Sequence, residues 1–177
     1  MRRITLFAII IAILVAPAFS KDKGHISVTA KAEIYNPPGD DLIAPMFTIE
    51  ARYRFNAYLA AVGSGSWTQY DLGDADVTFV PVAVDGEVHP FGTGIFDPFA
   101  GAGLAFNYKQ YDYSDDGNDE TDLTLGTEFF GGVSYKPQNQ FGFELNFKYR
   151  IEDVVNAGDS GSWSLGGGVT GSWEKDL

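Results

Sequence analysis

Residues 141–152 read Phe-Gly-Phe-Glu-Leu-Asn-Phe-Lys-Tyr-Arg-Ile-Glu, and apolar side chains occupy every odd position. The even positions hold glycine or polar residues, so the pattern repeats every two residues. This period predicts a β-strand with one apolar face and one charged face. Strands usually have about five to six residues, whereas a tilted strand needs about nine to eleven residues to cross a bilayer. The stretch therefore predicts a strand long enough to span a membrane.

The beginning of the chain has the features of a secretory signal peptide. Two arginines precede an apolar run over residues 4–15, and the small residues Ala18 and Ser20 follow at the positions that signal peptidase reads. The apolar run is shorter than the ~18 residues that a membrane-spanning helix needs, which argues against an uncleaved anchor. We expect cleavage near Ser20, with residues 1–20 as the signal peptide and residues 21–177 as a single barrel domain.

The composition excludes several classes of site. The chain has no cysteine, so it contains no disulfide scaffold, thiolate chemistry or cysteine-based metal site. It has only two histidines, which leaves little material for a zinc site. The formal net charge is −12, and no basic stripe is present, which argues against nucleic acid as a partner.

Strand signals recur along the chain and divide it into short segments. The expected strands cover residues 25–36, 45–55, 57–70, 77–89, 97–111, 121–135, 141–152 and 161–174. Shorter connections at residues 56, 89–96 and 136–140 alternate with longer, acidic connections at 37–44, 71–76, 112–120 and 153–160. Barrels with short periplasmic turns and longer outer loops have this organisation. The predicted fold is all-β, an eight-stranded antiparallel up-and-down transmembrane β-barrel.

Alternation alone does not decide whether the apolar face lines the lumen, as in a soluble lipocalin-like barrel, or faces lipid. The four longer connections and their edges hold fourteen acids, Glu152 among them, and no lysine or arginine. The polar strand faces instead hold six basic and six acidic residues. Balanced charge in a confined space indicates mutual pairing, because unpaired buried charge is costly. The predicted lumen network consists of Lys31, Glu33, Glu50, Arg52, Arg54, Asp85, Glu87, Lys109, Glu128, Glu144, Lys148 and Arg150.

Aromatic residues lie towards the ends of the expected strands, where the interfacial girdles of membrane barrels sit. The expected girdle residues are Tyr35, Phe55, Tyr58, Trp67, Tyr70, Tyr108, Tyr135, Phe141, Trp163 and Trp173. Their placement agrees with a barrel whose apolar face meets lipid. In the fourth segment Pro81 cannot donate to a strand ladder, which predicts a bulge or a local opening.

The stretch Phe96-Asp-Pro-Phe-Ala-Gly-Ala-Gly-Leu-Ala-Phe-Asn-Tyr108 resembles the P-Y-x-G-x-G-x-x-Y strand of small outer-membrane barrels of the OmpW, OmpX and opacity-protein kind. The resemblance implies a Gram-negative outer membrane, eight strands and no enzymatic activity. We also expect no cofactor. OmpW-like members are implicated in passage of small hydrophobic molecules, and opacity-like members in adhesion. The chain departs from such barrels at its end, where Trp173 or Leu177 stands in for the usual terminal aromatic residue.

One acidic segment is a weak candidate for a metal site. Asp115, Asp116, Asp119 and Glu120 cluster in the expected loop at 112–120, and carboxylates are ligands for Ca²⁺ and Mg²⁺. The spacing does not match the EF-hand loop. A solvated loop is the simpler interpretation, and divalent bridging to lipopolysaccharide phosphates is the alternative.

A lipid-modifying barrel enzyme would need a histidine with a serine and an acid at the outer mouth. His25 and His89 both lie at the expected periplasmic ends of strands, away from the outer leaflet. We therefore expect no enzymatic activity.

Two functions remain open for such a barrel. The first is passage of small, hydrophobic molecules, through an opening near Pro81 or near Gly101 and Gly103. The alternative is a structural or adhesive role of the acidic surface loops. A lipid-modifying enzyme and a soluble lipocalin-like carrier are less favoured. The expected surroundings are outer-membrane lipid and lipopolysaccharide, with a small hydrophobic ligand and divalent cations as candidate partners.

Overall fold

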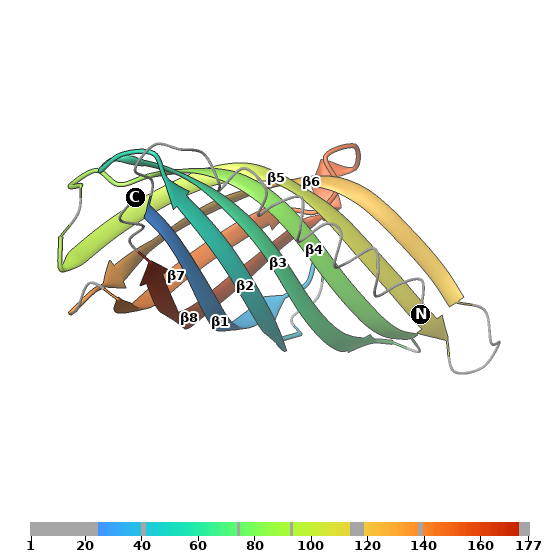
Figure 1. The fold of residues 1–177 in the computed structure, drawn as a ribbon. Coiled ribbons are helices and arrows are strands. Elements are labelled where there is room, and N and C mark those ends of the chain that lie inside the picture. The colour runs from blue at the N-terminus through green and yellow to red at the C-terminus, as the bar shows by residue number, and fades with distance from the viewer. Residues whose placement is uncertain are drawn as a thin grey trace.

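The strands of this protein close into a single barrel. The computed structural model describes residues 25–39, 42–73, 75–92, 94–113, 119–137 and 140–173. Consecutive strands pair antiparallel, and the first strand also pairs with the eighth, which closes the sheet (Figure 1). This arrangement confirms the predicted up-and-down barrel. The expected signal peptide, residues 1–20, lies outside the described residues.

The strand boundaries follow the sequence pattern closely. The strands are β1 (His25–Asn36), β2 (Ala44–Arg54), β3 (Leu59–Leu72), β4 (Ala75–Val88), β5 (Phe96–Tyr113), β6 (Asp119–Tyr135), β7 (Phe141–Ile151) and β8 (Gly161–Trp173). A 3₁₀-helix, η2 (Ala157–Asp159), lies between β7 and β8. No helix among the described residues is long and apolar enough to cross a membrane.

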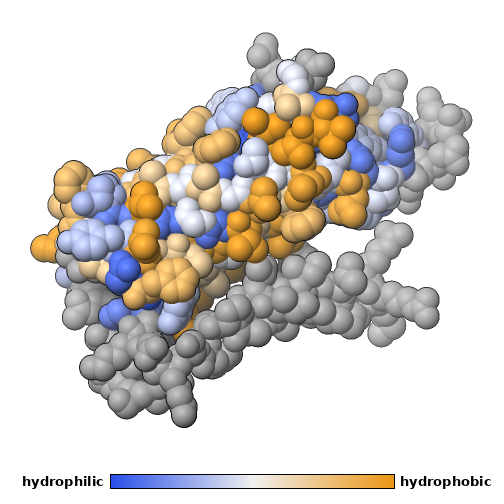
Figure 2. Space-filling model, turned by 90° about the horizontal axis from the view of Figure 1, so that it is seen from above, coloured by the Kyte–Doolittle hydropathy of each residue, from blue (hydrophilic) through white to orange (hydrophobic). Residues whose placement is uncertain are grey.

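The apolar face of the strands is on the outside of the barrel. In β7 the exposure alternates strictly, with Phe143 56% exposed and the adjacent Glu144 4% exposed. Figure 2 shows hydrophobic residues spread over much of the visible flank. A polar lumen inside an apolar exterior is the arrangement of a membrane barrel, and it excludes the inverted, lipocalin-like orientation.

Glycines on β8 make room for the large charged side chains that fill the lumen. Gly168 pairs directly with Lys31 of β1 on one side and with Glu144 of β7 on the other. A Cβ atom at Gly168 would lie 2.7 Å from the Cγ of Lys31. An eight-stranded barrel is only just wide enough for its own side chains, so one strand with small residues lets its neighbours extend inwards.

The outer connection between β3 and β4 is shorter than expected. The segment 71–76 was predicted to be a longer loop, but Leu72 pairs with Ala75, so that only two residues connect β3 to β4. Gly73 has a φ of 61°, a conformation that glycine adopts at little cost. At the expected loop 112–120 the strands also extend further than predicted, because β5 continues to Tyr113 and β6 begins at Asp119, while residues 114–118 lie outside the described residues. Length alone therefore does not identify the outer end of this barrel, and we assign that end from the acidic residues of its connections, as the sequence predicts.

Pro81 interrupts one ladder without inserting a residue. Between β3 and β4 the register passes from the pair of Gly65 with Val82 to the pair of Thr68 with Phe79. Within the described strands, the intervening Val80 and Pro81 form no pair with β3, yet both pair with β5. The register is the same on both sides of the gap, so the predicted bulge is absent from these described strands and a local opening of the ladder is present.

Candidate functional site: the charged lumen and the projecting sheet

The structure turns all twelve predicted lumen residues inwards. Eleven of them are buried, and Lys109 near the outer end keeps 14% of its side chain exposed. Each comes from the face of its strand opposite to the apolar, lipid-facing residues, because side chains alternate along a strand. The strand pattern thus positions six cations and six acids in one narrow space.

A central cluster links four strands across the lumen. Arg52 of β2 places Nε 2.7 Å from Oε1 of Glu87 on β4, and Nη1 3.0 Å from Oε2 of Glu144 on β7. Lys31 of β1 places Nζ 2.5 Å from Oε1 of Glu144 and 2.8 Å from Oε2 of Glu50. Ion pairs of this kind compensate for the loss of hydration, which is large for a buried ion.

A second cluster lies beside the first. Glu128 of β6 accepts bonds from two cations of β7, at 2.6 Å from Nζ of Lys148 and 2.8 Å from Nη2 of Arg150. Both cations also lie over aromatic rings, Lys148 over Phe130 at 5.6 Å and Arg150 over Phe79 at 5.8 Å from the ring centroids. Ring faces attract cations, so these rings add to the stabilisation of the buried charge.

Two predicted network residues have no ion pair among the described residues. Glu33 is buried and accepts a hydrogen bond from the Thr48 hydroxyl at 2.6 Å. Asp85 is also buried and packs against Gly103 of β5. The structure therefore brings ten of the twelve residues into ion pairs, with Asp97 and Glu152 as additional partners.

Sequence reasoning missed several lumen residues. Glu152 was assigned to the acidic outer connections, but it is 1% exposed and its Oε2 lies 2.7 Å from Nζ of Lys109. A signal for this existed, since Glu152 continues the alternation of residues 141–152. His89 and Asp97 are also buried, next to Arg54. They follow a strand end and a turn, where alternation is too short to assign a face.

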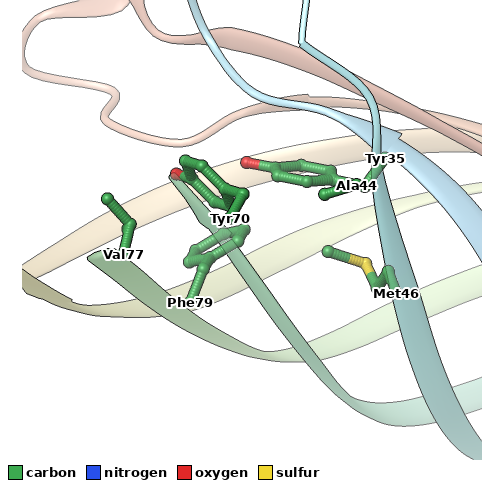
Figure 3. Close-up of a cluster of buried hydrophobic side chains, with 6 residues drawn as sticks. All are labelled: Tyr35, Ala44, Met46, Tyr70, Val77 and Phe79. Carbon is green, nitrogen blue, oxygen red and sulfur yellow. The ribbon is translucent and has the colours of Figure 1, made fainter. Parts of the chain in front are cut away.

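The outer mouth of the lumen is closed by apolar and aromatic side chains. Figure 3 shows this outer aromatic cluster, which consists of Tyr35, Ala44, Met46, Tyr70, Val77 and Phe79. The Tyr35 ring lies 5.5 Å from that of Phe79 and 5.9 Å from that of Tyr70, and its hydroxyl donates to Glu152. Tyr35 and Tyr70 were predicted to lie in the lipid-facing girdle, which is wrong. Both sit on the lumen face of their strands, so they cap the charged network.

Only some of the candidate metal ligands lie among the described residues. Asp115 and Asp116 lie outside the described residues. Asp119 begins β6, and Glu120 is exposed. The described part of the chain contains no group of three or more potential metal ligands. The metal site therefore stays a prediction.

Four strands extend beyond the rest of the barrel at its outer end. β6 pairs with β5 from Asp119 onwards but with β7 only from Thr127 onwards, because β7 ends at Ile151. On the other side, β3 pairs with β2 only as far as Thr68. We call residues 69–72, 75–78, 109–113 and 119–126 the projecting sheet. Its β5–β6 hairpin reaches furthest at this end of the molecule (Figure 1).

An acidic row crosses the projecting sheet. Asp71 pairs with Asp76, Asp76 with Asp112, and Asp112 with Asp119. Like charges directly opposite each other are destabilising in a sheet. Lys109 is the basic residue of the described projecting sheet, and it points into the lumen towards Glu152. The sheet therefore exposes acids with no compensating cation among its described residues.

The edge of β6 that points away from β5 is open as far as the described residues go. The carbonyl of Leu125 accepts a bond from the Val154 amide at 2.9 Å, so the backbone groups of Leu125 point away from β5. Backbone direction alternates along an antiparallel strand, so Thr121 and Leu123 point the same way. The described residues supply no strand to pair with them there. The Leu123 side chain is 71% exposed.

Comparisons with known proteins agree with this architecture. The family model described as "Outer membrane protein beta-barrel domain" matches residues 5–170. No curated protein matches the sequence. Among solved structures, Neisserial surface protein A gives a TM-score of 0.68 at 19% identity, over 84% of this chain and 96% of that one.

Two further solved structures have similar values. The N-terminal β-barrel domain of Pseudomonas aeruginosa OprF gives a TM-score of 0.65 at 16% identity, over 84% of this chain and 97% of that one. Ail, the attachment invasion locus protein of Yersinia pestis, gives a TM-score of 0.59 at 15% identity, over 87% of this chain and 100% of that one. At these low sequence identities, the similarity shows a shared fold and nothing about function.

Proposed function

The chain belongs to the family of outer membrane protein beta-barrel domains, and from this premise we propose that it acts as a surface-interaction barrel. Membership of this family implies the bacterial outer membrane as its location. In our proposal, the projecting sheet binds an extended, basic segment of a partner polypeptide at the cell surface. The proposal rests on one observation, the open outer edge of β6.

An open edge favours a strand as the partner. Unpaired amide and carbonyl groups along a strand are a template for another chain, which adds by main-chain hydrogen bonds. Thr121 and Leu123 present such groups, and the flanking strand β5 holds them in an extended conformation. A partner segment only a few residues long could pair with this edge.

The charge of the sheet favours a basic partner. Asp112, Glu120 and Asp122 are exposed on the β5–β6 hairpin. The cations of the described chain are directed to the lumen or its mouths, so they do not neutralise these acids. A segment containing lysine or arginine would gain favourable electrostatics and a faster association at low salt.

The filled lumen supports a role at the surface. The ion pairs around Arg52 and Glu128 occupy the middle of the barrel, and the outer aromatic cluster covers the outer mouth. An eight-stranded barrel has little space beyond that taken by its side chains. We therefore expect purified protein in a planar bilayer to conduct no steady ionic current.

The test uses synthetic peptides and the full barrel in lipid nanodiscs. A peptide that alternates lysine with valine is the probe, and its glutamate–valine counterpart is the control. Leu123→Pro removes the amide donor of the open edge and leaves the β5 ladder intact, whereas Leu123→Ala shortens the side chain and keeps the donor. We expect the proline variant to bind the lysine peptide roughly tenfold more weakly, the effect of about one lost hydrogen bond.

Three results would contradict the proposal. Equal binding of the two peptides would remove the argument from charge. Equal losses in Leu123→Pro and Leu123→Ala would show that the side chain, rather than the edge, makes the contact. No binding of the lysine peptide by the unaltered barrel would contradict both arguments.

Passage of small hydrophobic molecules is the second candidate. The gap in the ladder between β3 and β4 at Val80 and Pro81 favours it, because a weakened seam could open sideways into lipid. Replacing Pro81 with valine would restore a donor to the seam. Uptake of a small apolar dye by vesicles containing the barrel should then fall if this route operates, and should stay unchanged if it does not.

We propose no enzymatic activity for the chain. Both ring nitrogens of His89 already contact Glu87, Asp97 or Arg54, at the end of the barrel opposite to the projecting sheet. Divalent cations that bridge the acidic row to lipopolysaccharide phosphates remain a further proposal about the surroundings of the barrel, supported by the exposed carboxylates of Asp71 and Asp76.

A further inference from the structure

His89 connects the turns at the periplasmic end of the barrel. It follows β4 directly and is fully buried. Its amide donates to the carbonyl of Tyr58 in the β2–β3 turn at 2.8 Å, and its carbonyl accepts from Gly92 in the β4–β5 turn at 3.1 Å. The backbone of this one residue therefore joins two turns that are far apart in the sequence.

The imidazole ring of His89 is held by charged groups on both sides. Nε2 lies 2.6 Å from Oε1 of Glu87, and Nδ1 lies 2.8 Å from Oδ1 of Asp97. Nδ1 is also 2.8 Å from Nη2 of Arg54, which itself donates to Asp97. Asp97 further accepts from Nζ of Lys136, in the third periplasmic turn, at 3.2 Å. The ring thus connects, through Asp97, to that turn as well.

This arrangement satisfies the ring in two protonation states, but with different bonds. When both nitrogens are protonated, the ring donates to Glu87 and to Asp97. When the ring is neutral, Nε2 can donate to Glu87 while Nδ1 accepts from Arg54, and the bond to Asp97 is lost. A histidine whose partners change with its charge is a two-state element.

We propose that His89 is a proton-responsive latch that fastens the periplasmic turns when it is charged and loosens them when it is neutral. The groups that face it are Arg54 from β2, Glu87 from β4, Asp97 and Phe99 from β5, and Lys136 from the β6–β7 turn. The latch is independent of the surface function proposed above, since it lies at the other end of the barrel.

Taken together, the groups around His89 favour the protonated form of its ring. Burial and the positive charge of Arg54 lower the pKa of His89, but its hydrogen bonds to Asp97 and Glu87 and the charge of Glu87 outweigh them, and the pKa is raised above its ordinary value. A raised pKa in the folded state means that the stabilisation is fully present below the unfolded value of about 6.5 and is lost as pH rises through the folded value. The latch should therefore be closed in mildly acidic medium.

The first experiment needs no change to the latch itself. Nuclear magnetic resonance of the ring carbons follows His89 in the full barrel in nanodiscs, with His25→Gln used to assign the second histidine. We expect His89 to titrate above about 6.5. Amide exchange of Gly92 and Lys136 should accelerate across the same pH interval beyond the intrinsic increase, while amides in the outer turn near Gly73 should not.

The second experiment measures the unfolding rate of the barrel in SDS on heating, from the change in gel mobility. We expect unfolding to be roughly tenfold slower at about pH 5 than at about pH 8, the effect of about one charge-assisted hydrogen bond. His89→Gln keeps a polar side chain that cannot become charged, so this dependence should fall below about twofold. His25→Gln should retain it.

Either of two results would overturn the latch. A ring that titrates at or below about 6.5 would show that the neutral form is the favoured one. A pH dependence that is unchanged in His89→Gln would assign the effect to other groups. If His89→Gln does not fold, the titration and the amide exchange of the unaltered ring still decide the question.

Discussion

The two ends of the lumen are filled in different ways. Towards the periplasm, Arg52, Arg54 and Asp97 pair with partners on other strands, so that part of the lumen is ionic. Towards the cell surface, Tyr35 and Phe79 pack ring against ring, so that aromatic packing dominates there beside the ion pair of Lys109 with Glu152. Ion pairs depend on every partner being present, whereas packed rings tolerate modest changes of shape. The same narrow space should therefore respond very differently to substitution at its two ends.

The largest effect is expected from breaking the central cluster. Arg52→Ala leaves Glu87 and Glu144 buried with fewer cations, which should lower the free energy of unfolding by about 3–5 kcal/mol. Met46→Leu in the outer aromatic cluster conserves side-chain volume and should cost less than about 1.5 kcal/mol. Urea unfolding from lipid vesicles measures both. Equal losses of unfolding free energy in the two variants would contradict the expected difference between the two ends of the lumen.

Added volume tests how tightly the ionic part is filled. Gly168→Ala would place a methyl group 2.5 Å from the carbonyl oxygen of Ala30 and 2.7 Å from the Cγ of Lys31, and should destabilise the barrel by about 2 kcal/mol. Gly158→Ala in η2 is the matched control, because nothing lies within 4 Å of the new carbon. The same unfolding assay compares them. A neutral Gly168→Ala would mean that the lumen has spare room beside Lys31.

The hydrogen bond from Tyr35 in the outer aromatic cluster to Glu152 should contribute less to stability. Tyr35→Phe removes the hydroxyl that donates to Glu152 and should cost about 1.5 kcal/mol, because a bond to a charged acceptor is lost. Glu152 keeps its ion pair with Lys109, which limits the loss. Tyr135→Phe on the exposed face is the control. A loss as large as that of Arg52→Ala would show that the outer end is as dependent on its polar contacts as the inner end.

The smallest effect concerns the loop between β7 and β8. Asp153 accepts bonds from the Asn156 side chain and the Val155 amide, and these lower its pKa. Because the folded value is depressed, the order that Asp153 gives the loop is present above the unfolded pKa of about 3.9 and is lost as pH falls through the folded value. The Val155 amide resonance reports this change. A resonance that stays constant throughout acidification would contradict it.

The fold could be predicted almost entirely from the sequence, because alternation in stretches such as residues 141–152 is a direct consequence of one lipid-facing side. The same alternation predicts which charged side chains point into the lumen, Lys31 and Arg150 among them. The ion-pair partners could not be predicted, since they depend on which strands face each other across the lumen. Tyr35 and Tyr70 were misplaced because an aromatic residue near a strand end suits either a girdle or a cap. The projecting sheet was missed because it follows from register, which the composition of 112–120 does not reveal.

The cross-lumen ion pairs also have a consequence for assembly. Arg52 and Glu144 are 92 residues apart, and Lys31 reaches the same carboxylate from the first strand. A partly built sheet would bring these charges to the bilayer before their partners arrived. Contacts so distant along the chain form late and slowly. Insertion and closure should therefore occur as one cooperative step, in which β1 meets β8 as the last charges are neutralised.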